Sequence, residues 1–335
     1  MTRGPAGSNK RGVENSPSSR TGLARLRGLR RALEEAVLGQ EEALAGLCDA
    51  LLAGELGHTP AGRPRSIVLI LGLTGTGKTR AVAAASSHLY GTDAIARINA
   101  AEFASGQRVP LLLGSGPGQP GLLGAEIARL RRAGGRILLI DEIEKADPRV
   151  SDLLLGIEEA SVTLASGERL DLSDLHIVAT SNIGSQAIVE LEGVARSSLR
   201  RYVEQEAAAH FRPEVVARFS AILVFAQLSR DTQVRICRKM LEEEVAFQSG
   251  VLSRRFGHPH LVRAEPGVWT RLVSEGWSRR LGARPMRNAV ERRVRGALVE
   301  AQLRGALGPG VSETVLTCDA RSGVRAAVGR ADYVL

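Results

Sequence analysis

The sequence predicts an α/β fold in which a doubly wound parallel sheet is followed by a small, mostly helical second domain. Apolar runs typical of buried strands alternate with helical segments through the first two thirds of the chain. A glycine-rich turn joins one of these runs to an alanine-rich helix, and beyond Leu228 the pattern becomes helical. Because strands that alternate with helices form parallel sheets covered on both faces, we expect a doubly wound architecture.

Short apolar segments mark the strands of the predicted five-stranded sheet. They are Ile67–Leu71, Ile95–Asn99, Ile137–Ile140, Ile177–Thr180 and Ala221–Phe225. A helical pattern precedes them from Leu23 to Leu56 and is broken near Gly39. In the second domain the expected elements are helices over Arg230–Gln248, Glu265–Gly276 and Arg284–Gly305, and a short strand over Glu313–Cys318.

The most specific motif is Gly72-Leu-Thr-Gly-Thr-Gly-Lys78-Thr79, which fits the pattern of a phosphate-binding loop. It lies between a predicted strand and the helix over Arg80–His88, which is the context that this motif requires. Loop N–H groups and the helix N-terminus can hold phosphates, with Lys78 at the β- and γ-phosphates and the Thr79 hydroxyl on Mg²⁺. The predicted nucleotide contacts are Gly72, Thr74, Gly75, Thr76, Gly77, Lys78, Thr79 and Arg80.

Two carboxylates end the predicted strand Arg136-Ile-Leu-Leu-Ile-Asp141-Glu142. In a doubly wound sheet the carboxyl ends of the strands form the ligand site, so this pair should lie near the phosphate loop. Asp141 is the candidate to hold Mg²⁺, usually through water, because this ion keeps much of its hydration shell. Glu142 is the candidate general base that activates the attacking water.

From these patterns we predict four segments. They are a disordered basic tail over 1–21, a large α/β nucleotide-binding domain over 22–227, a small helical lid domain over 228–328 and a C-terminal tail over 329–335.

The chain is basic, with 45 Lys and Arg against 36 Asp and Glu and a net charge of +9. All of these cations are arginines except Lys10, Lys78, Lys145 and Lys239, so a lysine at position 78 indicates a need for a compact ammonium group. A basic chain can bind nucleic acid. The arginines are scattered without interleaved aromatic residues, however, which favours a solvated surface and makes a nucleic-acid partner unlikely.

The cysteines and the apolar runs indicate a cytoplasmic protein. Cys48, Cys237 and Cys318 are isolated and form no C-x-x-C motif, so we expect free thiols in a reducing compartment. No apolar run approaches the ~20 residues of a membrane span, and no signal peptide is evident at the N-terminus. We therefore expect no membrane partner.

The motifs together resemble the AAA+ ATPases of the Clp type, most closely the second ATPase module of ClpB-like disaggregases. The resemblance runs from about Val37 to about Val328. It is carried by Val37-Leu-Gly-Gln40, Asp141-Glu-Ile-Glu-Lys-Ala146, Thr180-Ser-Asn182, Phe211-Arg-Pro-Glu-Val-Val-Ala-Arg218 and Gly282-Ala-Arg284-Pro, in the order that the family has.

The resemblance implies ATP and Mg²⁺ as cofactors and assigns further site residues. Val37 and Leu38 would pack on the adenine base. Asn182 would orient the water beside Glu142, and Arg284 would reach the γ-phosphate from the lid. Arg218 would be an arginine finger that points into the site of a neighbouring subunit, which implies a homohexameric ring.

One loop departs from the family. Where Clp modules carry a Gly-Tyr-Val-Gly-like pore loop, this chain has Pro117-Gly-Gln119-Pro-Gly121, so Gln119 stands at the expected aromatic position. Leu122 and Leu123 follow as candidate substitutes. Since no convincing Ile-Gly-Phe/Leu docking loop is present, we expect no Clp-type peptidase partner.

Three functions are compatible with these features. The first is an ATP-hydrolysing ring motor of Clp type that remodels, unfolds or disassembles a protein substrate or complex, with an unknown protein substrate or adaptor as its partner. The second is a nucleotide-gated assembly or switch ATPase that does not thread polypeptide, which Gln119 favours. The third is a DNA-associated ATPase, which only the net charge favours.

Overall fold

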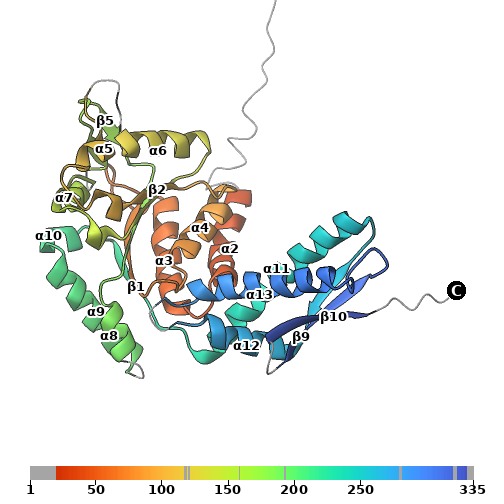
Figure 1. The fold of residues 1–335 in the computed structure, drawn as a ribbon. Helices are drawn as coiled ribbons and strands as arrows, with labels where there is room; N and C mark the ends of the chain where they lie inside the picture. The colour runs from red at the N-terminus through yellow and green to blue at the C-terminus, as the bar shows by residue number, and fades with distance from the viewer. Residues whose placement is uncertain are drawn as a thin grey trace, which may run out of the picture. The chain divides into compact units, whose positions relative to one another are not determined.

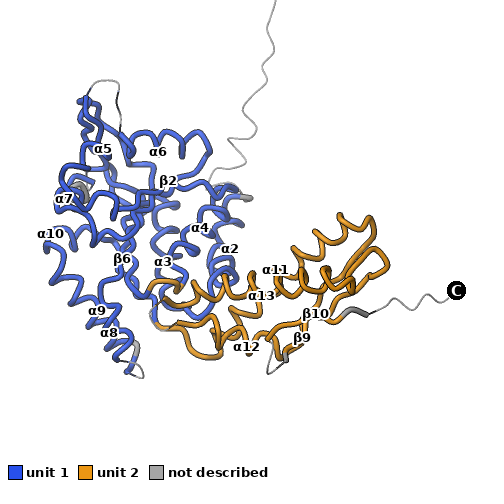
Figure 2. Tube along the Cα trace, viewed as in Figure 1, with its two compact units in different colours: residues 1–73, 77–226 blue, residues 74–76, 227–335 orange. Residues whose placement is uncertain are grey.

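The computed structural model describes residues 20–116, 119, 121–157, 159–191, 194–278, 281–319 and 323–329. The chain divides into two compact units (Figure 2). The first ends at Ala226 and the second begins at Gln227, and Thr74–Thr76 is grouped with the second unit.

A five-stranded parallel sheet forms the centre of the first unit (Figure 1). Its order is β2-β3-β6-β1-β7, with β1 over Ser66–Gly72, β2 over Ala96–Asn99, β3 over Ile137–Asp141, β6 over His176–Ser181 and β7 over Ala221–Phe225. Every residue of β1, β3 and β6 is buried, as expected for strands covered on both faces. The predicted fold class is confirmed.

Helices cover both faces of this sheet. One face packs on α2 (Arg20–Ala36), α3 (Glu41–Glu55) and α4 (Lys78–Tyr90) through a core that includes Leu44, Val68 and Phe225. The opposite face packs on the remaining helices of the unit. These are α5 (Val109–Leu113), α6 (Gly121–Arg132), α7 (Pro148–Ile157), α8 (Ser185–Glu190), α9 (Arg196–His210) and α10 (Pro213–Val216).

Several short elements of the first unit were not predicted. They are the 3₁₀ helices η1 (Ala100–Phe103) and η2 (Ile143–Lys145) and a hairpin of β4 (Ser161–Thr163) and β5 (Arg169–Asp171). Strands of three residues have too few positions for an alternating pattern to stand out in the sequence.

The second unit combines three helices with a small sheet. The helices are α11 (Arg230–Phe256), α12 (Pro266–Gly276) and α13 (Arg284–Leu303). The sheet has the order β10-β9-β8, with β8 over Leu261–Ala264, β9 over Glu313–Asp319 and β10 over Gly323–Gly329. Its core includes Leu241, Leu272 and Val294.

Predicted and observed boundaries differ in places. The strand expected at Glu313–Cys318 is present as β9, and it lies between β8 and β10, which were not predicted. Helix α11 continues to Phe256 rather than ending at Gln248, because Gly250 is tolerated within the helix and the left-handed C-cap lies at Gly257 (φ 75°). Arg20 and Thr21 belong to α2 rather than to the expected tail, and residues 1–19 and 330–335 lie outside the described part.

None of the helices in the described ranges is both long and apolar enough to cross a membrane.

A buried polar cluster lies at the amino ends of β1 and β6, at the opposite end of these strands from the phosphate loop. The Glu55 carboxylate accepts hydrogen bonds from Tyr90 Oη (2.9 Å) and His176 Nε2 (3.2 Å) and forms an ion pair with Arg65. His176 Nδ1 lies 2.8 Å from Ser66 Oγ. These contacts link α3 and α4 to the amino ends of β1 and β6.

The cluster holds Glu55 ionised and His176 neutral. Burial would raise the pKa of Glu55, but the hydrogen bond from His176 and the charge of Arg65 outweigh it and lower the pKa to about 2. Burial is the largest influence on His176 and lowers its pKa, although Glu55 opposes this shift. Both groups therefore bind more protons in the unfolded chain than in the folded one, so acid destabilises the fold.

We predict that Glu55→Gln reduces the free energy of unfolding at pH 7 by about 1–3 kcal/mol, the cost of a lost charged acceptor among buried donors. The stabilisation from Glu55 is present above its ordinary pKa of 4.5 and is lost as the pH falls towards 2. Urea unfolding at pH 7 and pH 3 should therefore show a smaller difference between variant and parent at pH 3. The exposed control Glu35→Gln should change neither value by more than about 0.5 kcal/mol. An equal loss at both pH values would contradict the role given to the Glu55 charge.

Candidate functional site

The carboxyl ends of three neighbouring strands form the candidate nucleotide site. β6 lies between β3 and β1, so the ends of these strands meet at one edge of the sheet. The phosphate loop follows β1, Asp141 ends β3, and Asn182 follows β6. The sheet order thus brings residues from three distant parts of the sequence together.

Two glycines of the phosphate loop occupy positions that no other residue fits. At Gly72 a Cβ atom would lie 2.4 Å from the Phe225 carbonyl oxygen, and the φ of Gly72 is 134°. At Gly77 it would lie 2.8 Å from a Val37 methyl group, and the φ of 105° is left-handed. Gly77 is the N-cap of α4, so the loop delivers the chain directly into a helix N-terminus that can bind phosphate.

Lys78 is held in the site by backbone and side-chain acceptors. Its Nζ lies 2.5 Å from Gly72 O, 3.0 Å from Leu73 O and 3.1 Å from Asn182 Oδ1. Burial lowers the pKa of Lys78 to about 8, although the charges of Glu144, Asp141 and Glu142 act in the opposite direction. The ammonium group therefore loses most of its hydration and stays cationic because of these carboxylates.

Asp141 is buried and both of its carboxylate oxygens have donors. Oδ1 accepts the Thr180 hydroxyl at 2.8 Å, and Oδ2 lies 2.6 Å from Arg97 Nη2 and 2.7 Å from Arg97 Nε. The side chain of Asp141 is 8% exposed, whereas that of Arg97 is 60% exposed. Asp141 is thus fixed in direction by a buried hydroxyl and neutralised by an arginine that reaches in from solvent.

Glu142 has an unusual backbone conformation and its own cationic partner. Its φ of 56° is left-handed, which is uncommon for a residue with a Cβ and is found most often at functional sites. Its N–H donates to Thr180 Oγ1 at 3.3 Å, and its carboxylate pairs with Lys145 Nζ at 2.7 Å. The carboxylate is 36% exposed, so water can reach it.

Asn182 joins the lysine to a further carboxylate. Its Oδ1 accepts from Lys78 Nζ, while its backbone N–H and Nδ2 donate to Glu144 Oε1 at 3.2 and 3.3 Å. Asn182 therefore lies next to Lys78, between this lysine and Glu144. Its predicted role, the orientation of a water beside Glu142, stays a prediction.

The remaining predicted contacts lie at various depths. Val37 is buried against Gly77, and Leu38 is half-buried. Thr79 and Arg80, in the first turn of α4, are exposed. Arg284 is exposed and is the first residue of α13 in the second unit, and its contact with the γ-phosphate stays a prediction.

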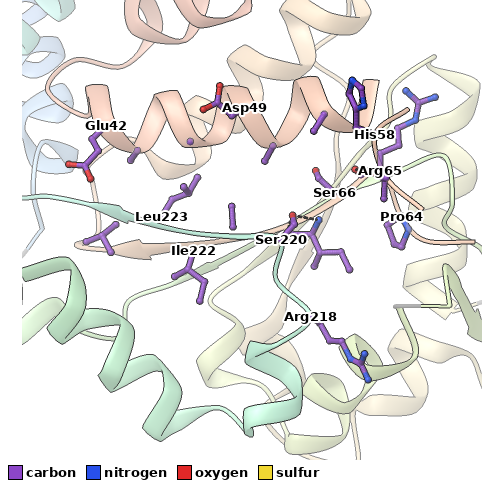
Figure 3. A pocket seen from close by; sticks show the side chains of 18 of the residues that line it. Glu42, Asp49, His58, Pro64, Arg65, Ser66, Arg218, Ser220, Ile222 and Leu223 are labelled. Carbon is purple, nitrogen blue, oxygen red and sulfur yellow. Dashed lines mark hydrogen bonds between the residues drawn. The ribbon is translucent and has the colours of Figure 1, made fainter. Parts of the chain in front are cut away.

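Arg218 lies on the rim of a cavity in the first unit rather than among the other site residues (Figure 3). The cavity has a volume of about 590 Å³ and lies between α3 and β7. Asp49 and Glu42 of α3 line one side, and His58 gathers with Arg65 at one end. This cavity is separate from the strand ends that carry the phosphate loop.

The donors at the site fit a magnesium ion bound together with phosphates. No group of three or more His, Cys, Asp or Glu side chains in the described residues is arranged to hold a metal ion by itself. Thr79 and Asp141 offer one hydroxyl and one carboxylate, both oxygen ligands. Mg²⁺ prefers such a sparse set, because it retains several waters and takes phosphate oxygens from the nucleotide.

Four residues that contact the site were not among the predicted site residues: Arg97, Glu144, Lys145 and Thr180. Lys145 carried a signal, since lysine is rare in this chain. Thr180 belonged to a recognised motif but had no assigned contact. Arg97 gave no signal, because it is one of many scattered arginines and only strand pairing places it beside Asp141.

In the segment predicted as a pore loop, residues 117, 118 and 120 lie outside the described ranges. Gln119 is exposed, its N–H donates to Gly116 O at 3.1 Å, and Ser115 donates to its side-chain oxygen. Leu122 is 37% exposed, but Leu123 is buried in the core and cannot substitute for a surface aromatic residue.

Two family models match consecutive parts of the chain. Residues 63–222 match the AAA domain of the Cdc48 subfamily. Residues 228–315 match the C-terminal D2-small domain of ClpB protein. The first match contains the site residues from Gly72 to Arg218, and the second contains Arg284.

Curated relatives and solved structures agree with these matches. The chain is 33% identical to the chaperone protein ClpB of Pseudomonas putida over 84% of this chain and 33% of that protein. It is 30% identical to the chloroplastic chaperone protein ClpD of Arabidopsis thaliana over 88% of this chain and 32% of that protein. The closed-state cryo-EM structure of Hsp104 with ATPγS and FITC-casein superposes with a TM-score of 0.79 at 25% identity, covering 95% of this chain and 54% of that one.

The chain thus spans about one third of the length of these curated relatives, 33% of ClpB and 32% of ClpD. The matched part ends in the D2-small domain, so it corresponds to their second ATPase module. The chain belongs to the Clp/Hsp100 family of AAA+ ATPases, as a homologue of that second module.

Proposed function

We propose that this protein is a Mg²⁺-dependent ATPase that works as a homohexameric ring and remodels a protein substrate or complex. The convergence of Lys78 after β1, Asn182 after β6 and the Asp141–Glu142 pair at the end of β3 carries this proposal. It supplies a buried cation for phosphate, an oriented carboxylate for a metal and a solvent-accessible carboxylate for a general base. The similarity to ClpB and Hsp104 supports the choice of a protein as substrate.

Each residue has a distinct task in the proposed hydrolysis. Lys78 and the N–H groups at the start of α4 bind the phosphates, and Thr79 and Asp141 hold the metal, which supplies positive charge to the phosphate oxygens. Glu142 accepts a proton from the attacking water, and its left-handed backbone sets the direction of its side chain. Lys145 must release the Glu142 carboxylate, or share it, when the water is activated.

We predict that Glu142→Gln binds ATP with parental affinity but hydrolyses it about 100-fold more slowly, because the general base is lost. Lys78→Ala should instead weaken nucleotide binding itself, since its ammonium group no longer offsets phosphate charge. Fluorescent-nucleotide binding and phosphate release measure these effects, with the exposed Glu159→Gln as an unaffected control. Parental turnover by Glu142→Gln would remove Glu142 from the mechanism.

The position of Arg218 supports a finger that acts in trans. β7 runs parallel to β1 with Gly72 beside Phe225, so the phosphate loop of the same subunit lies at the carboxyl end of β7. Arg218 precedes the amino end of β7 at Ala221. The strand alone spans four steps of about 3.3 Å, roughly 13 Å, which an arginine side chain does not bridge easily. In the proposed ring, the phosphate that Arg218 reaches would therefore belong to a neighbouring subunit.

Arg218→Ala is expected to keep nucleotide affinity yet lose most of its ATPase activity. Arginine fingers contribute about 10³–10⁵ in rate in GTPases, so the effect should be large. Because one mixed interface regains both a finger and a general base, mixing Arg218→Ala with Glu142→Gln should restore part of the activity. Parental turnover by Arg218→Ala alone would exclude the finger assignment.

A nucleotide-gated assembly ATPase that does not thread polypeptide is the second candidate function. The observation that favours it is Gln119, an exposed polar residue where Clp modules carry an aromatic, together with the burial of Leu123. An aromatic side chain gives a large contact area at low entropic cost, and glutamine does not. A DNA-associated ATPase rests on net charge alone.

We predict that casein stimulates the parental ATPase weakly and that Gln119→Tyr increases this stimulation by about twofold or more, through added contact area. Gln119→Asn is the matched control and should behave as the parent. Robust ATP-driven unfolding of a stable folded reporter by the parental protein would show that Gln119 does not limit how tightly the protein holds a polypeptide substrate. ATP-dependent assembly without any stimulation would favour the second candidate.

A further inference from the structure

Arg97 forms an ion pair with Asp141, the carboxylate that the proposed mechanism assigns to the metal. Its Nη2 and Nε both contact Asp141 Oδ2, at 2.6 and 2.7 Å. Strand pairing puts it there, because Asn99 is the partner of Asp141 in β3 and Arg97 lies two residues earlier on the same face of β2. The side chain then runs along the strand to the end of β3.

The second oxygen of Asp141 is already engaged, since Oδ1 accepts the buried Thr180 hydroxyl. Oδ2 is therefore the oxygen through which Asp141 could take a metal ion or a metal-bound water. A guanidinium and a divalent cation at the same oxygen repel each other and demand the same lone pairs. Arg97 and the metal must compete for Asp141.

The neighbouring carboxylate is neutralised in the same way. Glu142 pairs with Lys145 at 2.7 Å, and Lys78 adds a buried cation nearby. The acidic strand end thus has little net negative charge with which to attract a free divalent ion. The phosphates of ATP add negative charge to the site. A metal ion that binds together with ATP can therefore displace Arg97 from Asp141, whereas a metal ion without nucleotide cannot.

We propose that Arg97 is a positioning residue that competes with Mg²⁺ for Asp141 and so makes metal binding depend on bound nucleotide. The proposal rests on the proposed function, in which Asp141 holds the metal. The exposure of the two side chains suits an exchangeable contact. Asp141, 8% exposed, needs a partner while no metal neutralises it, whereas Arg97, 60% exposed, can return to water at little cost.

The test measures metal binding, not turnover. The Arg97 parent and the Arg97→Gln variant both carry Glu142→Gln, so that the nucleotide is not hydrolysed. Each full chain is treated with EDTA and mixed with a fluorescent ATP analogue, and Mg²⁺ is then titrated in. We expect Arg97→Gln to lower the Mg²⁺ midpoint about two- to fivefold, the range of an exposed ion pair. Mg²⁺ alone should raise the melting temperature of Arg97→Gln but not of the Arg97 parent.

Two variants show whether the charge is responsible. Arg97→Lys keeps the charge but loses the contact through two nitrogens, so its midpoint should lie between those of the parent and of Arg97→Gln. Arg169→Gln removes an exposed arginine of β5 that pairs with Glu159 and should change nothing. Circular dichroism of each variant confirms folding, and if Arg97→Gln does not fold, Arg97→Met, which also removes the charge, is titrated in its place with the same expected midpoint.

An unchanged or raised Mg²⁺ midpoint in Arg97→Gln would overturn the proposal, because Arg97 would then be neutral or supportive at Asp141. An Arg97→Lys midpoint that falls as far as that of Arg97→Gln would also overturn it, since the charge would not be the cause. If the parent binds the analogue with no dependence on Mg²⁺, the metal role of Asp141 in the proposed function fails, which is a distinct result.

Discussion

The buried ammonium group of Lys78 is the interaction on which the rest of the site depends. It is held by two carbonyl oxygens of its own loop and by Asn182, so its position requires the β1–β6 pairing as well as the turn. Burial lowers the pKa of Lys78, and the carboxylates of Asp141, Glu142 and Glu144, at and just after the end of β3, act in the opposite direction. The loop, the strand order and the acidic motif therefore have to form together.

The site contains two cations besides Lys78, the residue assigned to the phosphates. Arg97 pairs with Asp141 and Lys145 pairs with Glu142, so the two carboxylates assigned to the metal and to the general base each have a cationic partner. A buried carboxylate without a partner is costly, and these contacts remove that cost. Both cations are more than half exposed, with side-chain exposures of 60% and 51%, so they can return to water at little cost, as the proposed exchange with a metal ion requires.

The two ends of the sheet have different demands. At the carboxyl ends, polar groups face a site that water and ligand must enter. At the amino ends, Glu55, His176 and Ser66 form a closed cluster that is buried and satisfied by its own members. The cluster anchors the far ends of α4 and β6, whose other ends carry Lys78 and Asn182. The amino ends of the strands thus carry a buried cluster that stabilises the fold, and the carboxyl ends carry the candidate site.

The sequence by itself determined the fold class, the order of strands and helices, and the phosphate loop and acidic strand end, because each of these is written in local periodicity and spacing. Only the tertiary structure decided that Arg97 reaches Asp141, that Asn182 joins Lys78 to Glu144, and that Leu123 is buried. The strands β4, β5, β8 and β10 were not predicted either, and β4 and β5 have only three residues each, too few for an alternating pattern to stand out. The contacts of Arg97, Asn182 and Leu123 could not be predicted because they arise from strand pairing and side-chain packing between residues far apart in the chain, and the local sequence does not specify which distant partner a residue will meet.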